Sequence, residues 1–243
     1  MKTIVILQPQ FFPWRGVFEQ IRLCDEFVHL DDVQFPKGGF TNRVQIKTAD
    51  GPLWLTVPVL RSGSLPPINE VEIDYKTDWR LKHVRSFAMS YAHAPHLREA
   101  RSILDDVYAE RPRTVAELDI AALERCSAEL GLRPRFSRAS DTPVGGAKTD
   151  RLIALLAPRR ATRYVTGRGA LDYLDAHRLS LQGIEVRVMQ YTRRAYPQLH
   201  GPFDPHVSIL DAIANHGSHA PWVLESEAIS WDEAVALNFQ AVG

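Results

Sequence analysis

Polar side chains follow two short apolar runs near the start of the chain. The run Thr3–Leu7 ends at Gln8, and the run Phe27–Leu30 ends at Asp31 and Asp32. A carboxylate at a strand exit can bind Mg²⁺, act as a base or hydrogen-bond a ribose, and a side-chain amide there needs a partner. We therefore expect ligand contacts from Gln8 and from one aspartate, because adjacent strand residues face opposite sides. The alternative is that one aspartate caps the loop and the other forms a salt bridge.

The loop after the first run combines prolines, aromatic residues and a glycine. Pro9 and Pro13 stiffen it, and Gly16 permits the close approach of a backbone or a ligand. In a doubly wound sheet this loop lies at the carboxyl ends of the strands, where ligands bind. Its aromatic residues are consistent with a tightly packed turn, or with contacts to a ligand or a protein partner: Phe11, Phe12 and Trp14.

Two further groups of residues could bind an anion. Asn42, Arg43 and Lys47 lie on a predicted β-hairpin, and two cations beside an amide suit a phosphate or a carboxylate. Arg43 is also the salt-bridge partner available to an aspartate. Lys148 and Thr149 follow two glycines just before a helical pattern, where backbone N–H groups can hold an anion. The spacing is not that of a P-loop.

The histidines give no metal-binding pattern. His83 lies in a helical segment, where it is either structural or a candidate base, and His93 and His96 are too loosely spaced to indicate zinc. We expect no metal site. The sequence also contains no nucleophile elbow, kinase signature or dinucleotide-binding glycine loop.

The elements that must position these residues alternate between strand and helix. An apolar strand over Thr3–Leu7, a helix over Pro13–Asp25 and a strand over Phe27–Leu30 predict a right-handed parallel crossover. Alternation between Phe40 and Leu60, with a turn at Ala49-Asp50-Gly51, predicts an inserted β-hairpin. The fold class expected is α/β, with a doubly wound, mainly parallel sheet and helices on both faces.

Further along, the pattern predicts five helices and three more strands. Thr114 and Glu117 form a capping box at the start of the second of these helices, and Gly131 ends it. Ser62–Pro67 is expected to be a flexible loop. The expected helices are 79–94, 115–130, one beginning at 151, and 170–177, with a short helix at 208–215. The expected strands are 71–73, 164–167 and, as the last one, 183–189.

Length and composition fit a single globular domain over residues 1–243. Lys plus Arg and Asp plus Glu number 29 each, so there is no general attraction to nucleic acid. Cys24 and Cys126 lie in apolar helical patterns and predict no disulfide framework. The first apolar run is too short for a signal peptide or a membrane span, which predicts a cytoplasmic location.

The sequence resembles the WbqC-like family in ordered segments over nearly the whole chain: Ile6–Phe18, Phe27–Phe35, Asn42–Lys47, Trp54–Val59, Tyr196–Phe203 and Ser208–Gly217. The resemblance implies a role in bacterial lipopolysaccharide, O-antigen or natural-product biosynthesis. Leu7 departs from the pattern, since relatives commonly carry His there. If that His does chemistry in relatives, this protein either lacks a catalytic group or uses His83 or His200 instead. The residues carried over by resemblance are Gln8, Pro9, Asp31, Asp32, Asn42, Arg43, Gln198, Ser208, Asp211 and Asn215.

Three functions fit these features. The first is a transferase that moves an acyl or aminoacyl group onto an amino sugar or similar amine, with Asp31, Asp32 or His83 as the base. Its substrate would be a small molecule such as a nucleotide sugar or an acyl donor; the residues leave the cofactor and the oligomeric state open. The second is a nucleotidyltransferase-like enzyme that binds a nucleotide. The third is a non-catalytic binding or scaffold protein.

Overall fold

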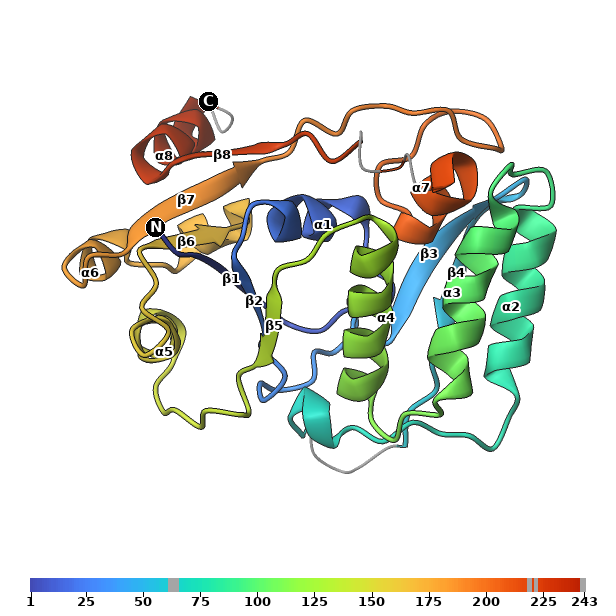
Figure 1. Cartoon of the computed structure of the whole chain (residues 1–243), viewed down its shortest axis with the longest axis horizontal. Coiled ribbons are helices and arrows are strands. Elements are labelled where there is room, and N and C mark those ends of the chain that lie inside the picture. The colour runs from blue at the N-terminus through green and yellow to red at the C-terminus, as the bar shows by residue number, and fades with distance from the viewer. Residues whose placement is uncertain (61–65, 218–219, 221–222, 241–243) are drawn as a thin grey trace.

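A six-stranded sheet forms the centre of the protein, seen here in a computed structural model that describes residues 1–60, 66–217, 220 and 223–240 (Figure 1). The strands lie in the order β5-β2-β1-β6-β7-β8. All neighbours are parallel except β8, which pairs antiparallel with β7. The strands are β1 (Thr3–Leu7), β2 (Glu26–His29), β5 (Arg135–Arg138), β6 (Arg163–Thr166), β7 (Glu185–Gln190) and β8 (Glu227–Ser230).

Helices cover both faces of this sheet because successive residues of β1 point to opposite sides. Val5 belongs to one core, which includes Phe18 of α1 (Arg15–Arg22). Ile4 and Ile6 belong to the other, which includes α5 (Lys148–Leu156) and α6 (Ala176–Ser180). The fold is thus α/β and mainly parallel, as predicted, and β1 is buried on both faces as its unbroken apolar run indicates.

The long connection from β2 to β5 carries the predicted hairpin and a helical layer beside it. The hairpin pairs β3 (Arg43–Thr48) with β4 (Gly51–Thr56) as a separate antiparallel sheet. The helical layer lies beside the hairpin in Figure 1 and consists of α2 (Trp79–Ser90), α3 (Leu97–Ala109) and α4 (Val115–Glu129). The Thr114 capping box at the start of α4 is present as predicted.

Several predicted elements differ from the structure. The segment 170–177 is not one helix: a 3₁₀ turn, η2 (Arg168–Asp172), is followed by α6, because the Asp175 side chain caps a new helix by accepting from the Arg178 N–H. The strand predicted at 71–73 is reduced to isolated bridges beside η1 (Ile68–Glu70). The helix expected from 151 begins at Lys148. Most of the predicted loop at 62–67 lies outside the described residues.

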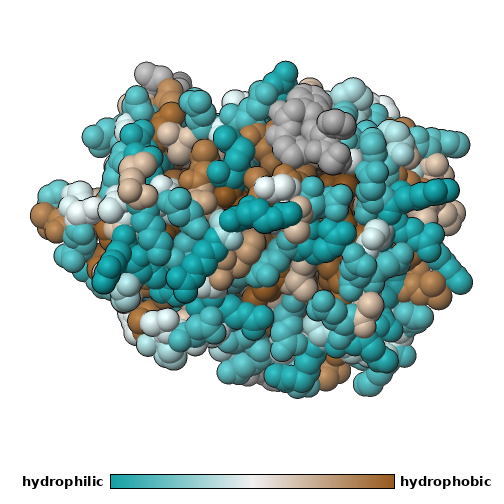
Figure 2. All heavy atoms as spheres, viewed as in Figure 1, coloured by the Kyte–Doolittle hydropathy of each residue, from teal (hydrophilic) through white to brown (hydrophobic). Residues whose placement is uncertain are grey.

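The C-terminal part adds elements that the pattern did not predict. The short helix is α7 (Ile209–His216), with Ser208 as its N-cap. The predicted last strand is β7, but β8 and α8 (Trp231–Gln240) follow it. On the face shown in Figure 2, hydrophilic residues predominate and apolar ones form small groups. No helix in the described part of the chain is long and apolar enough to cross a membrane.

Candidate functional site

A crevice of about 550 Å³ opens at the carboxyl ends of β1 and β6. From β1 the chain moves outward to β2 and β5, then returns to place β6 on the other side of β1. The loops that leave β1 and β6 therefore diverge, which is the point where open α/β sheets bind ligands. The residues that line the crevice include Gln10, Trp14, Arg168, Tyr191, Arg193 and His206.

Trp14 and Tyr191 form the aromatic wall of this crevice, and Trp14 is fixed by the start of α1. It immediately precedes α1 and forms an isolated backbone bridge with Ser208. The indole lies over Gly16, where a Cβ would come within 2.3 Å of the ring, so only glycine leaves room for it. The ring centroids of Trp14 and Tyr191 are 5.0 Å apart, and that of His206 lies 5.8 Å from Trp14. A flat or ring-shaped ligand would find apolar contact here.

Arg168 and Arg193 give the crevice its positive charge. Arg168 lies between two glycines in the loop after β6, and Arg193 follows β7. Both are exposed, and neither forms an ion pair among the residues that the structure describes. Two uncompensated guanidinium groups beside aromatic rings suit phosphate or carboxylate groups attached to a ring.

Tyr191 keeps a hydroxyl proton available in the crevice. Its oxygen accepts a hydrogen bond of 2.5 Å from Nε2 of Gln20, so its own O–H is free to donate. Burial raises the pKa of Tyr191 to about 12. The phenol is therefore protonated at neutral pH and can donate to an oxygen of a bound ligand.

A buried ion pair beneath the crevice fixes the segment that carries Tyr191 and Arg193. Arg15 and Glu19 lie one turn apart on α1, with Nε and Oε1 separated by 3.5 Å. Arg15 also donates to the backbone carbonyl of Arg194. Burial lowers the pKa of Arg15 and raises that of Glu19. The chain after β7 is thus held against the start of α1.

The predicted residues at the strand exits lie apart from this crevice, with the exception of Trp14. Gln8 is exposed and Pro9 is buried. The buried Asp31 carboxylate accepts from the backbone N–H and the hydroxyl of Ser140 at 3.0 and 2.7 Å. Asp32 forms a 2.6 Å ion pair with Arg151 of α5. Both aspartates therefore tie the end of β2 to neighbouring segments. The predicted salt bridge is formed by Asp32, and its partner is Arg151 instead of the predicted Arg43.

The predicted residues of the hairpin and of α2 also have internal partners. Asn42 donates to the carbonyl of Val57, and the guanidinium of Arg43 lies 4.5 Å from the centre of the Trp54 ring. His83 is buried, with Nδ1 3.0 Å from the Tyr108 hydroxyl and Nε2 3.1 Å from the Thr56 carbonyl. None of His83, Asp31 and Asp32 lines the crevice.

The remaining predicted anion-binding residues lie at the start of α5. Lys148 is exposed, whereas Thr149 is buried and its hydroxyl accepts from the Asp175 N–H. Two aromatic residues predicted as possible partner contacts, Phe11 and Phe12, have no exposed surface. They are core anchors, so of the three aromatic residues on which the scaffold interpretation depended only Trp14 has exposed surface.

Five predicted residues from distant parts of the sequence do meet, in a buried polar cluster centred on Asp211. Tyr91 and Tyr196 each donate to its carboxylate at 2.8 Å. The predicted members of the cluster share hydrogen bonds with Asp211 or with residues bonded to it, that of Ser208 being from the Asp211 N–H to its carbonyl: Lys47, Gln198, Ser208 and Asn215. Asp211 is fully buried, so this cluster holds the C-terminal segment to the hairpin and to the Phe12 loop.

The crevice residues that the sequence did not reveal come from loops far apart in the chain. Gln20 and Tyr191 carried no motif, and Gln10 had only its place in the segment Ile6–Phe18. Arg168 had only a strand running into a glycine loop as a signal. The glycine loop becomes a specific signal only when the strand order is known. The strand order places the end of β6 beside the end of β1. No group of three or more His, Cys, Asp and Glu residues that could hold a metal is found among the described residues.

The fold defines an α/β protein with a crevice at the switch point of its mainly parallel sheet. A family model described as the WbqC-like protein family matches residues 8–222, and the chain belongs to this family. It is similar to a protein of Mycobacterium tuberculosis called uncharacterized protein Rv1507c, with 38% identity over 224 residues. The match covers 91% of this chain and 96% of that protein. No solved structure matches.

We predict that Asp211→Ala lowers the free energy of unfolding by about 3–5 kcal/mol, because it leaves buried tyrosine hydroxyls and the Lys47 ammonium without their acceptor or counter-charge. Urea denaturation followed by circular dichroism measures this loss. Asp172→Ala, at an exposed position, is the control and should change stability by less than about 0.5 kcal/mol. Equal effects of the two substitutions would contradict the structural role of Asp211.

A second prediction concerns His83, whose pKa burial lowers from 6.5 to about 4. Protonation therefore favours the unfolded chain: the contribution of His83 to stability is complete above pH 6.5 and is lost as the pH falls to about 4. Over this window we expect wild type to lose on the order of 3 kcal/mol more stability than His83→Gln. The exposed His93→Gln variant should follow the wild-type pH curve, and a parallel curve for His83→Gln would refute the assignment.

Proposed function

We propose that this chain is a transferase that binds a phosphate-bearing amino sugar, such as a nucleotide sugar, in the crevice and moves an acyl or aminoacyl group onto its amine. The proposed setting is bacterial lipopolysaccharide, O-antigen or related biosynthesis. The observation that carries the proposal is the pair of uncompensated guanidinium groups, Arg168 and Arg193, beside the Trp14–Tyr191 wall. Phosphate oxygens would bind the arginines, and the sugar or base ring would lie against the aromatic wall.

The chemistry needs a base and a donor for the developing oxyanion. The amine nitrogen attacks the carbonyl carbon of the donor, the C–N bond forms, and the bond to the leaving group then breaks. His206, whose imidazole lines the crevice, would take the proton from the amine and return it to the leaving group. The hydroxyl of Tyr191 would donate to the oxyanion. We assign the base to His206 because Asp31, Asp32 and His83 already have internal partners.

A nucleotidyltransferase-like function is the second candidate. The observation that favours it is the strand order: β5-β2-β1-β6-β7 is the order of doubly wound sheets that bind nucleotides across the same crevice. Both candidates use the crevice. They differ in the ligand, since the second requires a nucleoside triphosphate and the first does not.

Replacing both crevice arginines should weaken nucleotide-sugar binding. Each lost charge-assisted hydrogen bond costs about 1.5–3 kcal/mol, so Arg168→Gln/Arg193→Gln should raise the dissociation constant at least about 100-fold. Isothermal titration with UDP-N-acetylglucosamine, UDP-glucosamine, coenzyme A, ATP and CTP measures this and separates the two candidates. Arg98→Gln, an exposed arginine on α3, is the matched control. Unchanged affinity in the double variant would disprove the crevice as the anion site.

If His206 is the base, its replacement should affect turnover, whereas replacement of the arginines affects binding. His206→Asn should lower the turnover number about 100-fold or more with little change in substrate affinity, because a base acts on the reacting proton and not on the phosphate. Formation of the amide product from UDP-glucosamine and an acyl donor, followed by mass spectrometry, measures turnover. His177→Asn, an exposed histidine on α6, is the control. Full activity of His206→Asn would reject this residue as the base.

A further inference from the structure

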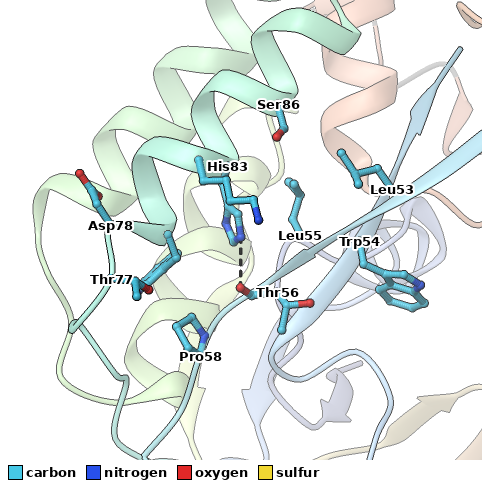
Figure 3. A pocket seen from close by; sticks show the side chains of 11 residues that line it. Leu53, Trp54, Leu55, Thr56, Pro58, Thr77, Asp78, His83 and Ser86 are labelled. Atoms are coloured by element: carbon cyan, nitrogen blue, oxygen red, sulfur yellow. Dashed lines mark hydrogen bonds between the residues drawn. The ribbon is translucent and has the colours of Figure 1, made fainter. Parts of the chain in front are cut away.

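A second cleft, of about 510 Å³, lies between β4 and α2, and among the described residues it shares no lining residue with the crevice. The strand forms one side and the helix forms the other, as Figure 3 shows. His83 and Ser86 lie one turn apart on the helix and line the cleft. Leu53 of the strand and Pro58 just after it add apolar groups to the wall. A flat ring therefore finds apolar contact beside the backbone of β4.

The outer edge of β4 faces this cleft with its backbone groups. In an antiparallel pair, each residue points its N–H and C=O the same way, and successive residues alternate between the partner strand and the outside. The Val57 N–H donates to the Asn42 carbonyl across the hairpin, so the odd-numbered residues of β4 point toward β3. The N–H and C=O groups of Trp54 and Thr56 therefore point outward. The hydrogen bond between His83 and the Thr56 carbonyl agrees with this direction (Figure 3).

Only a short part of this edge is free. His83 occupies the Thr56 carbonyl, and because a carbonyl can only accept, the imidazole Nε2 is the donor. Further along the chain, the Asp74 N–H occupies the carbonyl of Pro58. In the other direction, Pro52 has no N–H and lies outside the wall of the cleft. Addition of an extended peptide strand uses a longer row of outward groups, so this edge does not suit a peptide.

Three backbone groups remain on the edge, in the order donor, acceptor, donor. They are the Trp54 N–H, the Trp54 C=O and the Thr56 N–H, and none has a partner among the described residues. The complementary edge of a ligand is acceptor, donor, acceptor. An imide in a ring has this edge, because its N–H is flanked by two carbonyls on the same side.

Uracil is the nucleic-acid base of RNA that carries an imide. Its pairing edge presents carbonyl, N–H and carbonyl side by side, and proteins read such edges by hydrogen bonds. Cytosine and guanine present two like groups next to each other on the same edge. Adenine presents one donor and one acceptor only. Of these bases, uracil alone matches all three free groups of β4.

A buried donor without a partner lies in the same wall. Trp79 is 5% exposed and lines the cleft, and its indole N–H has no hydrogen-bond partner among the described residues. Unpaired buried donors are costly, because they lose their bond to water without a replacement. The ribose of a nucleoside supplies oxygen acceptors for this N–H. Its hydroxyls also suit the exposed Lys82 and the half-buried Ser86.

We infer that this cleft binds the uracil base of a nucleoside or nucleotide, with the imide edge on the backbone of Trp54 and Thr56. The Trp54 N–H donates to one imide carbonyl, and the imide N–H donates to the Trp54 carbonyl. The Thr56 N–H donates to the second imide carbonyl. Leu53 and Pro58 provide apolar contact for the ring. The inference stands on these contacts and not on the crevice.

Backbone and indole N–H signals measured by two-dimensional NMR test this site. Titration with uridine should shift the N–H signals of Trp54, Thr56 and the Trp79 indole. N3-methyluridine, in which a methyl group replaces the imide proton, should bind about tenfold or more weakly, because the Trp54 carbonyl loses its donor. Cytidine should bind as weakly, because its ring nitrogen places an acceptor against the same carbonyl. Equal affinity for uridine and either analogue would overturn the inference.

Two substitutions on α2 locate the site. Ser86→Phe should fill the cleft and abolish the uridine shifts, whereas Met89→Phe, at an exposed position of the same helix, should leave them unchanged. Uridine shifts that persist in a folded Ser86→Phe variant would overturn the inference. The comparison of the three nucleosides uses the wild-type protein, so it decides the matter even if Ser86→Phe does not fold.

The arginine variant separates this inference from the proposed function. Arg168→Gln/Arg193→Gln should show the full uridine shifts at Trp54 and Thr56, because both arginines belong to the crevice. Loss of these shifts in the variant would place the base in the crevice and overturn the inference. The proposed function depends instead on the loss of nucleotide-sugar binding by the crevice, which signals of Tyr191 and Gln20 report separately.

Discussion

Burial of β1 on both faces and both edges is the constraint on which the rest of the structure depends. Ile4 and Val5 face opposite cores, and β2 and β6 pair with the two edges of the same strand. A strand in this position can turn its backbone toward solvent only at its two ends, and the chain continues from the C-terminal one. The loop that follows must therefore run between the diverging exits of its neighbours, and the crevice lies there because of the strand order, whatever residues the loop contains.

Buried polar groups then hold the C-terminal segments against this loop. Arg15 binds the chain after β7, and the Asp211 cluster, together with Ser208, binds the start of α7 to the Phe12 carbonyl. Charges in such positions stabilise little by themselves, because their desolvation offsets their attraction. They do restrict the arrangement, since any other position would leave buried donors and acceptors unpaired. The segments that carry Tyr191, Arg193 and His206 reach the crevice through this restriction.

The sequence predicts the sheet and its hairpin because their signals are local. Thr3–Leu7 is apolar almost without interruption and Val44 to Val57 alternates. Burial of β1 follows the first pattern, and burial of Val44, Ile46, Leu55 and Val57 follows the second. The strand Arg135–Arg138 escapes the same analysis, because it lies at an edge and carries two exposed arginines. The break before Ala176 depends on one capping aspartate inside a helical pattern. The position of an edge strand and the start of a capped helix depend on contacts with other segments. The periodicity of apolar residues does not report those contacts.

The candidate site shows why polar residues at strand exits are ambiguous in a sequence. Asp31 and Asp32 stand where ligand-binding carboxylates are expected, yet Ser140 after β5 and Arg151 of α5 bind them internally. Arg168 and Arg193 receive no such partner within the described residues, although only the two glycines beside Arg168 distinguish either of them locally from other exposed arginines. What separates a structural charge from a ligand-binding one is whether the fold supplies a counter-charge. That property belongs to the assembled sheet, and neither the motif residues nor their spacing reports it.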